Sequence, residues 1–249
     1  MKSTAIGAGT FAARFTTTPP IKICCIQSET EARMAISAGA SALGLVSEMP
    51  SGPGVIPEEL IAKIAASVSP PILTFLLTSK RTAPEIIAQQ RRCGTNTIQI
   101  CDRLNDGAYA ALREALPSVG LVQVIHVTGE ASVAEALEAA RHVDALLLDS
   151  GNPSAPVKEL GGTGRVHDWD LSRRIAGEAG VSVFLAGGLK PENVRQAFDA
   201  VRPFGLDVCS GVRNNDRLDR DKLARFIAKI FPKTRRFAAS EGDMFGPPA

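Results

Sequence analysis

Eight short apolar runs recur along the chain, and each is followed by an alanine-rich stretch with helical spacing. The runs are apolar along their whole length, so both faces of the resulting sheet must be covered. Parallel strands joined by helices meet this requirement, because a right-handed crossover lays its helix on the sheet. The expected strands are 21–25, 42–46, 72–77, 97–100, 121–125, 145–148, 181–185 and 206–208, and the expected helices are 29–38, 58–66, 84–92, 108–115, 133–141, 171–180, 191–201 and 220–231.

Eight such units fit an α/β fold with a single (β/α)8 TIM barrel. The rival architecture is a doubly wound open sheet. It is disfavoured because the only early glycine-rich turn, Gly7 to Gly9, precedes the first strand, so the dinucleotide fingerprint is missing. We expect residues 1–18 to form a loosely ordered extension, 19–231 the barrel, and 232–249 a tail rich in Gly, Pro and mixed charge.

Composition excludes several classes of function. The 28 Lys+Arg and 26 Asp+Glu give a formal charge of +2, and the basic residues are scattered, so nucleic acid is not an expected partner. No apolar run approaches the roughly 18 to 20 residues of a membrane span. The five cysteines form no C-x-x-C pair and the histidines do not cluster, which argues against a disulfide framework and a zinc site. We therefore expect a cytoplasmic protein without metal, in which a single thiol can be reactive.

Polar residues at the strand ends are the candidates for catalysis, because barrels of this type place the active site at the carboxyl ends of their strands. Side chains alternate along a strand, which predicts that Lys22 and Cys24 share one face while Cys25 takes the other. The candidates are Lys22, Cys24, Cys25, Gln99, Cys101, His126, Asp149, Asp207 and Ser210.

Three consecutive loops carry glycines, after the sixth, seventh and eighth strands. Backbone N–H groups at helix N-termini bind phosphate, and the last loops of such barrels are the usual phosphate site. Each glycine alone would indicate only a tight turn, but three adjacent loops favour a phosphate site. The expected phosphate-binding residues are Gly162, Gly164, Gly187, Gly188, Ser210 and Gly211.

Several motifs occur together in one order over residues 21–231. They are Lys22-Ile23-Cys24, Leu147-Leu148-Asp149-Ser150, Gly161-Gly162-Thr163-Gly164 with Asp168-Trp169, Leu185-Ala186-Gly187-Gly188-Leu189 with Pro191-Glu192-Asn193-Val194, and Asp207-Val208-Cys209-Ser210-Gly211-Val212. This set resembles the phosphoribosylanthranilate isomerase family. The resemblance implies an Amadori rearrangement of N-(5-phosphoribosyl)anthranilate in tryptophan biosynthesis. It also implies a small phosphosugar substrate, no cofactor, and a monomer or homodimer.

By this resemblance, Cys24 is the general base that removes the proton from ribose C2, and Asp149 is the general acid that protonates the ring oxygen. A thiol near a lysine and helix N-termini can have a lowered pKa, and a carboxyl group in an apolar setting can keep a proton to donate. The structural alternatives are a small buried hydrophobe for Cys24 and a helix cap for Asp149. The motif context favours catalysis for both.

The remaining substrate contacts are less specific. Asp207 either orients the sugar hydroxyls or braces the loop after the eighth strand. Lys22 either steers the phosphate or is neutralised by a neighbouring carboxylate. The expected substrate-binding residues are Lys22, Gln99, Arg103, His126 and Asp207.

Three positions depart from the family pattern. Cys25 stands where the family has glycine, and Cys101-Asp102 replaces His-Gly at the fourth strand. The loop after the second strand reads Ser51-Gly52-Pro53-Gly54 and lacks the family's arginine, which pairs with the anthranilate carboxylate. Losing such a contact weakens binding by roughly 1.5 to 3 kcal/mol.

Arg103 or His126 is a candidate replacement cation, because each follows a neighbouring strand end. Alternatively, Asp102 and Arg103 form a solvated pair at the start of a surface helix. The departures leave two further functions open. One is a related barrel isomerase acting on another ribosyl or ribulose phosphate, and the other is a non-catalytic paralogue that binds phosphometabolites.

Overall fold

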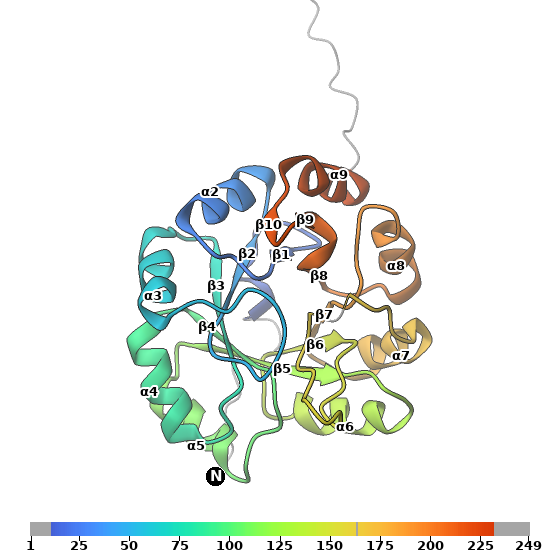
Figure 1. Cartoon of the computed structure of the whole chain (residues 1–249). Helices are drawn as coiled ribbons and strands as arrows, with labels where there is room; N and C mark the ends of the chain where they lie inside the picture. Colours follow the sequence, from blue (N-terminus) through green and yellow to red (C-terminus); the bar gives the residue numbers. More distant parts are fainter. Residues whose placement is uncertain (1–10, 163, 232–249) are drawn as a thin grey trace, which may run out of the picture.

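A computed structural model describes residues 11–162 and 164–231 and shows eight parallel strands closed into a barrel (Figure 1). Each strand pairs with the next along the chain, and β8 pairs with β1 through Ile23 and Val208. The predicted barrel is therefore confirmed. The strands are β1 (Ile21–Ile23), β2 (Ala42–Val46), β3 (Leu73–Thr78), β4 (Thr97–Ile100), β5 (Gly120–His126), β6 (Ala145–Asp149), β7 (Ser182–Leu185) and β8 (Gly205–Val208).

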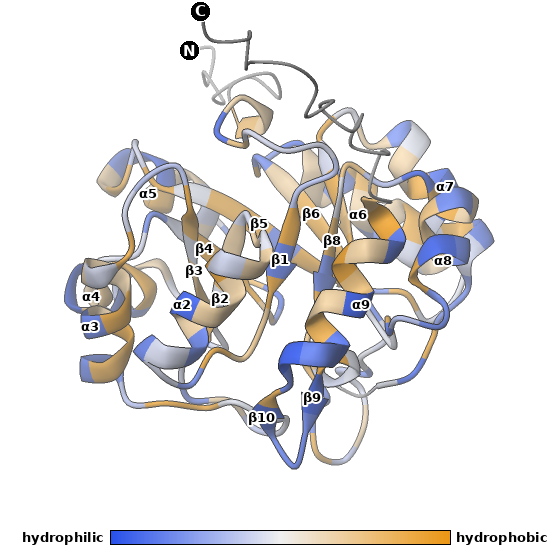
Figure 2. Cartoon of the chain, turned by 90° about the horizontal axis from the view of Figure 1, so that it is seen from above, coloured by the Kyte–Doolittle hydropathy of each residue, from blue (hydrophilic) through white to orange (hydrophobic). Residues whose placement is uncertain are grey.

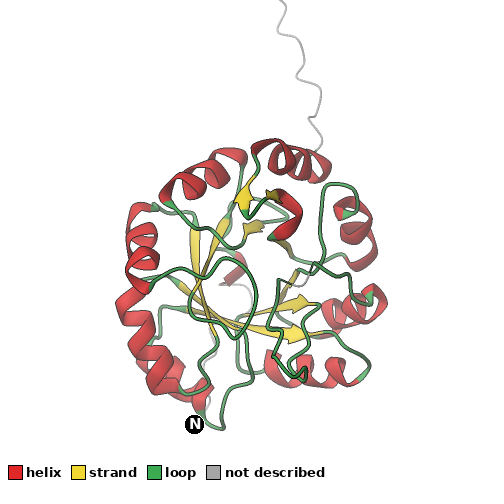
Figure 3. Cartoon of the chain, viewed as in Figure 1, coloured by secondary structure: helices red, strands yellow, loops and turns green. Residues whose placement is uncertain are grey.

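Helices form the outer ring, with long loops crossing one face inside that ring (Figures 1 and 3). They are α2 (Glu29–Ala38), α3 (Glu58–Ser67), α4 (Ala83–Cys93), α5 (Ala108–Ala115), α6 (Ala131–Ala140), α7 (Trp169–Glu178), α8 (Val194–Val201) and α9 (Arg220–Ile230). A 3-10 turn, η1 (Ser210–Val212), and a hairpin of β9 (Arg213–Asn214) and β10 (Arg217–Leu218) lie between β8 and α9. None of the helices in the described part of the chain is long and apolar enough to cross a membrane.

Several element boundaries differ from the sequence prediction, and two of the differences have a clear local reason. The first strand ends at Ile23 rather than at residue 25, because Cys25 has a positive φ of 62° that breaks the extended backbone. The helix expected over 191–201 begins at Val194. The side chain of Asn193 accepts from the Lys190 N–H and donates to the Gly188 carbonyl, which holds the preceding residues in a turn.

Apolar side chains form two buried clusters, one between strands and helices and one inside the barrel. Figure 2 shows most of the barrel strands coloured as hydrophobic, whereas the helices carry both hydrophobic and hydrophilic residues. The inner layer includes the rings of Phe75 and Phe184, whose centroids lie 6.3 Å apart. Phe11 is almost fully buried, and Phe15 contacts Phe11, Phe184 and Phe204 with ring centroids 5.6 to 5.7 Å apart.

Residues 11–15 thus pack onto the amino-terminal end of the barrel, where Gly120 begins β5 against Phe11 and Arg14. Within the expected extension, residues 11–15 are thus held against the barrel by apolar burial. The rest of that extension, residues 1–10, and the predicted tail, 232–249, lie outside the described residues.

Candidate active site

A cavity lies at the carboxyl ends of the strands, and the space within its outline, including the part open to solvent, is about 670 Å³. Residues from every strand end or following loop except those of β5 line it. Among the lining side chains are the two expected catalytic residues, Cys24 and Asp149, together with Gln99, Asp207 and Ser210. The fold therefore brings these five predicted site residues together.

Gly44 on β2 makes room for the functional end of β1. A Cβ at this position would lie 2.8 Å from the Cys24 Sγ and 3.0 Å from the Lys22 Nζ, and both distances are too short for ordinary contact. The two side chains share the inner face of β1, as alternation predicts. A side chain on β2 would force them apart.

Lys22 lies below the cavity and forms a buried ion pair. Its Nζ is 2.9 Å from Asp207 Oδ1 and sits 5.3 Å from the centroid of the Phe75 ring. Burial disfavours the charge on Lys22, but Asp207 and the neighbouring thiols Cys24 and Cys25 outweigh it and raise the pKa of Lys22. Of the two sequence interpretations, the geometry matches neutralisation by a neighbouring carboxylate.

Cys24 is 5% exposed and faces the cavity. A hydrogen bond from the Cys25 thiol and the charge of Lys22 lower the pKa of Cys24, although burial and Asp207 oppose the shift. Hydrogen bonding with the thiols of Cys209 and Cys24, together with burial, raises the pKa of Cys25 well above its usual range. Cys24 is thus the thiol of this pair that loses its proton more readily.

Asp149 is the last residue of β6 and also faces the cavity. Its Oδ1 accepts the N–H of Ser150 at 2.7 Å. The helix after this strand is capped by another carboxylate, Asp168, which accepts from the N–H groups of Asp170 and Leu171. Asp149 is therefore not the N-cap of α7.

The glycine loops after β6, β7 and β8 lie side by side at the cavity wall. Among the expected phosphate-binding residues, Gly162, Gly164, Gly187, Gly188 and Ser210 line the cavity. Gly211 does not line it; a Cβ there would lie 1.9 Å from the Leu189 carbonyl oxygen. The role of Gly211 in the structure is thus to let the β8 loop approach the β7 loop closely.

The loop after β2 reaches the loop after β6 across the cavity mouth (Figures 1 and 3). The Ser51 hydroxyl donates to the Lys158 carbonyl at 2.6 Å, and Gly52 and Pro53 line the cavity beside Gly162. The cavity is therefore covered from the β2 side by a segment that carries Pro53.

The family model for N-(5'-phosphoribosyl)anthranilate (PRA) isomerase matches residues 21–229, which include all eight strands. The chain belongs to this isomerase family. It is 33% identical over 224 residues to N-(5'-phosphoribosyl)anthranilate isomerase of Methanosarcina acetivorans, covering 84% of this chain and 92% of the relative. The corresponding isomerase of Haloferax volcanii is 33% identical over 225 residues, 90% and 97% of the two chains.

Solved isomerases of this family share the fold. The enzyme from Thermococcus kodakaraensis superposes with a TM-score of 0.71 at 29% identity, over 84% of this chain and 97% of its own. A family member in complex with reduced 1-(o-carboxyphenylamino)-1-deoxyribulose 5-phosphate superposes with a TM-score of 0.69 at 25% identity, over 86% and 98%.

In the present chain, two of the residues expected to contact substrate lie away from the cavity. Arg103 is exposed, and its backbone N–H and carbonyl bond to Asp102 and Arg81. His126 is buried, with its Nε2 3.1 Å from the Cys101 carbonyl oxygen. Neither side chain lines the cavity, because the ends of β4 and β5 direct them to other neighbours.

The alternative of an Asp102–Arg103 side-chain pair is not what the structure shows either, because Asp102 pairs with Lys158 at 2.6 Å. None of the described residues that line the cavity is arginine or lysine. The missing arginine of the β2 loop is thus not replaced by a cation among these residues.

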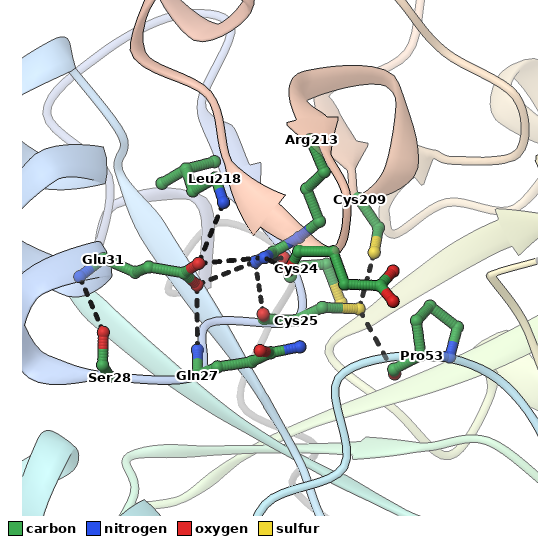
Figure 4. Close-up of polar contacts among 10 residues, drawn as sticks. Cys24, Cys25, Gln27, Ser28, Glu31, Pro53, Cys209, Arg213 and Leu218 are labelled. Carbon is green, nitrogen blue, oxygen red and sulfur yellow. Dashed lines mark hydrogen bonds and ion pairs between the residues drawn. The ribbon is translucent and has the colours of Figure 1, made fainter.

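The sequence did not predict an ion pair, Arg213 with Glu31, that holds the backbone of Cys24 and Cys25 (Figure 4). Arg213 donates to the carbonyl oxygens of Cys24 and Cys25 and pairs with Glu31 at 3.1 Å. Glu31 also accepts the N–H groups of Gln27 and Leu218. Burial opposes ionisation of Glu31, but Arg213 and these N–H groups outweigh it and lower its pKa. An acid in a first helical turn looks like an ordinary dipole partner in sequence, so it gave no signal of this role.

Proposed function

We propose that this protein converts N-(5'-phosphoribosyl)anthranilate into 1-(2-carboxyphenylamino)-1-deoxyribulose 5-phosphate by acid–base catalysis without a cofactor, as an aldose–ketose isomerase. The observation that carries the proposal is the presence of Cys24 and Asp149 in one cavity bounded by the glycine loops. The relatives named for this activity support it, as does the product-like ligand in one family structure.

The phosphate would be held by backbone N–H groups of Gly162, Gly164, Gly187 and Gly188 and by Ser210, with no lysine or arginine required. This places the sugar between β1 and β6. The aryl ring would then lie toward the opposite wall, where Met49, Pro53, Leu77 and Leu160 provide apolar surface.

Catalysis begins at the ribose ring. Asp149 donates its proton to the ring oxygen as the bond between this oxygen and C1 breaks, and the aryl nitrogen forms an iminium with C1. The Cys24 thiolate then removes the C2 proton, which gives an enolamine. Tautomerisation to the C2 ketone, with a proton added to C1, completes the isomerisation, so no electron carrier is consumed.

The neighbouring polar groups prepare these steps. Lys22 favours the thiolate of Cys24, and its pairing with Asp207 keeps the carboxylate of Asp207 in place beside the sugar. Gln99, whose side chain lines the cavity, would hydrogen-bond a sugar hydroxyl. Gly211 contributes to the phosphate site only by shaping the loop. Arg103 and His126 have no role in this proposal.

We propose a cellular compartment and an oligomeric state together with the reaction. The absence of paired cysteine motifs in the sequence supports action in the cytoplasm. A monomer or a homodimer is consistent with the family, in which the Thermotoga maritima enzyme is described as dimeric.

One observation favours a second candidate function. The described residues lining the cavity include no cation for the anthranilate carboxylate. A ribosyl or ribulose phosphate without that carboxylate would use the same acid, base and phosphate loops, and its binding would not be weakened by the missing cation. It is therefore the alternative substrate class.

The deciding experiment follows the fluorescence of phosphoribosylanthranilate, generated in situ, with wild type, Cys24→Ala and Asp149→Asn. Removing a general acid or base should slow turnover about 10²- to 10⁴-fold. Cys93→Ala and Asp199→Asn are matched controls, because Cys93 lies at the end of α4 and Asp199 is in an exposed pair with Arg195. Absence of turnover by folded wild type would contradict the proposal and favour the second substrate class.

A further inference from the structure

Two thiols face each other at the wall of the cavity. The Sγ atoms of Cys25 and Cys209 lie 2.6 Å apart, and both residues line the cavity (Figure 4). Cys25 follows the end of β1, and Cys209 lies between β8 and η1. Residues 184 positions apart in the chain thus form a dithiol.

The two cysteines lie at the ends of neighbouring paired strands. Ile23 is in register with Val208, and the Cys24 N–H donates to the Val208 carbonyl at 2.9 Å. Neighbouring strands lie about 4.7–4.9 Å apart, and disulfides join Cα atoms about 4.4–6.8 Å apart. Cys209 directly follows β8 and Cys25 comes two residues after the end of β1, so a bond between their sulfurs, which lie 2.6 Å apart, would join two neighbouring strand ends.

The direction of the Cys25 side chain comes from its backbone. The alternation rule predicted that Cys25 would face away from Cys24, and this prediction was wrong because φ of Cys25 is +62°. Arg213 holds the Cys25 carbonyl oxygen, and the Cys25 Sγ lies 3.6 Å from the Pro53 carbonyl oxygen. These contacts turn the thiol toward Cys209 instead of into the layer beneath the helices.

The pair is accessible to a small oxidant from one side. Cys209 is half-buried at the cavity wall, whereas Cys25 is 4% exposed. Of the three other cysteines, Cys24 faces the cavity as the proposed base, and Cys93 and Cys101 are fully buried. Burial raises the pKa of Cys93 to about 12 and that of Cys101 still further, so neither thiol supplies the thiolate for the first attack on a small disulfide.

We propose that Cys25 and Cys209 form a redox modification site, which low-molecular-weight disulfides such as oxidised glutathione convert into an intramolecular disulfide. The thiolate of Cys209 attacks one sulfur of the small disulfide, forming a mixed disulfide and releasing one thiolate. The thiolate of Cys25 then attacks the Cys209 sulfur and releases the second. The two protein thiols lose two electrons and two protons, and one small disulfide becomes two thiols.

The bond changes the environment of Cys24. In the reduced protein hydrogen bonding with the Cys25 thiol lowers the pKa of Cys24, and a disulfide has no proton for such a bond. Oxidation therefore reduces the thiolate fraction of Cys24 at neutral pH and slows isomerisation. This effect on turnover rests on the proposed function, whereas formation of the bond does not.

The first measurement needs no turnover. The full chain is equilibrated with mixtures of reduced and oxidised glutathione, and free thiols are counted by alkylation and mass spectrometry. We expect wild type to lose two of its five thiols and to yield one linked peptide pair, Cys25 with Cys209. Cys93→Ala, the matched control, should form the same link, and Cys209→Ser should form none.

Three results would overturn the proposal. They are a stable glutathione adduct on Cys209, a link that involves Cys24 or Cys101, and loss of two thiols by Cys209→Ser. Cys25→Gly is a second variant that tolerates the positive φ, and it too should form no link. Circular dichroism of each variant verifies that it is folded.

The second measurement compares turnover of phosphoribosylanthranilate before oxidation, after oxidation, and after treatment with dithiothreitol. Wild type should lose activity about tenfold or more and recover it on reduction, since the base is part of a general acid–base pair. Cys209→Ser should keep its own initial activity through the same treatment. An equal loss of activity in wild type and Cys209→Ser would indicate that oxidation acts at Cys24, and would contradict the inference. Absence of turnover by every reduced protein would instead contradict the proposed function and leave the thiol count to decide the inference.

Discussion

The guanidinium of Arg213 donates to the carbonyl oxygen of Cys25, the residue at which β1 leaves the extended conformation. The same guanidinium reaches the Cys24 carbonyl oxygen at 3.3 Å and pairs with Glu31. A buried ion pair thus fixes the backbone of the segment that carries the proposed base. Because Arg213 follows β8 and Glu31 lies in α2, the contact also closes the barrel between its first and last units.

Arg213→Met should destabilise the protein and misplace Cys24. Breaking a buried ion pair leaves the Glu31 charge uncompensated, which costs about 3–5 kcal/mol. We expect the urea midpoint to fall and kcat for phosphoribosylanthranilate to fall more than KM rises. Arg217→Met, at the exposed position of strand β10, is the control and should change neither. A variant with a lowered midpoint but unchanged kcat would show that Arg213 acts on stability alone.

Gly44→Ala should reduce activity through Cys24. The added methyl group would lie 2.8 Å from the Cys24 Sγ and must displace it or Lys22. Overpacking of this kind costs about 1–3 kcal/mol. Gly177→Ala in α7 is the control, because a Cβ there meets no atom within 4 Å and helical alanine is favoured by about 0.5–1 kcal/mol. If Gly44→Ala reacts with iodoacetamide and turns over as wild type does, the close contact has no functional effect.

The strand pattern predicted the fold because every barrel strand is buried on both faces. Burial of this kind leaves continuous apolar runs that are visible without any knowledge of partners. The ends of strands were less predictable. Cys25 was assigned to the wrong face because alternation assumes extended backbone, and a φ of +62° violates that assumption.

Contacts between distant segments gave no sequence signal. Arg213 and Glu31 are 182 residues apart, so only the closed barrel reveals their pairing. Arg103 and His126 were predicted to contact substrate, but neither lines the cavity. Arg103 follows the end of β4 and His126 is the last residue of β5, but position at a strand end does not determine side-chain direction.

The pH dependence of kcat/KM tests the origin of the Cys24 thiolate. Activity should rise with pH through the pKa of Cys24, which lies below the usual thiol value because of Cys25 and Lys22. Cys25→Gly removes the hydrogen-bond donor, so the pKa of Cys24 should rise and the profile should shift to higher pH. The other charged or titratable groups near Cys24, present in both proteins, are Asp207, Cys101 and Asp149.

An unshifted profile for Cys25→Gly would mean that Lys22 alone sets the thiolate population. Cys93→Ala serves as the thiol control for this comparison. Its profile should coincide with that of wild type, because Cys93 lies at the end of α4 and does not line the cavity.

Pro53→Arg tests whether substrate binding is weakened because the cavity lacks a cation for the anthranilate carboxylate. Pro53 lies at the mouth beside Gly162, and no lysine or arginine is among the described lining residues. A charge-assisted contact with the anthranilate carboxylate is worth about 1.5–3 kcal/mol, so KM for phosphoribosylanthranilate should fall about 10-fold or more while kcat changes little. Pro53→Gln has a comparable length without the charge and should leave KM nearly unchanged. Equal KM values for both variants would mean that the carboxylate does not reach this side of the mouth, and would favour a substrate that lacks it.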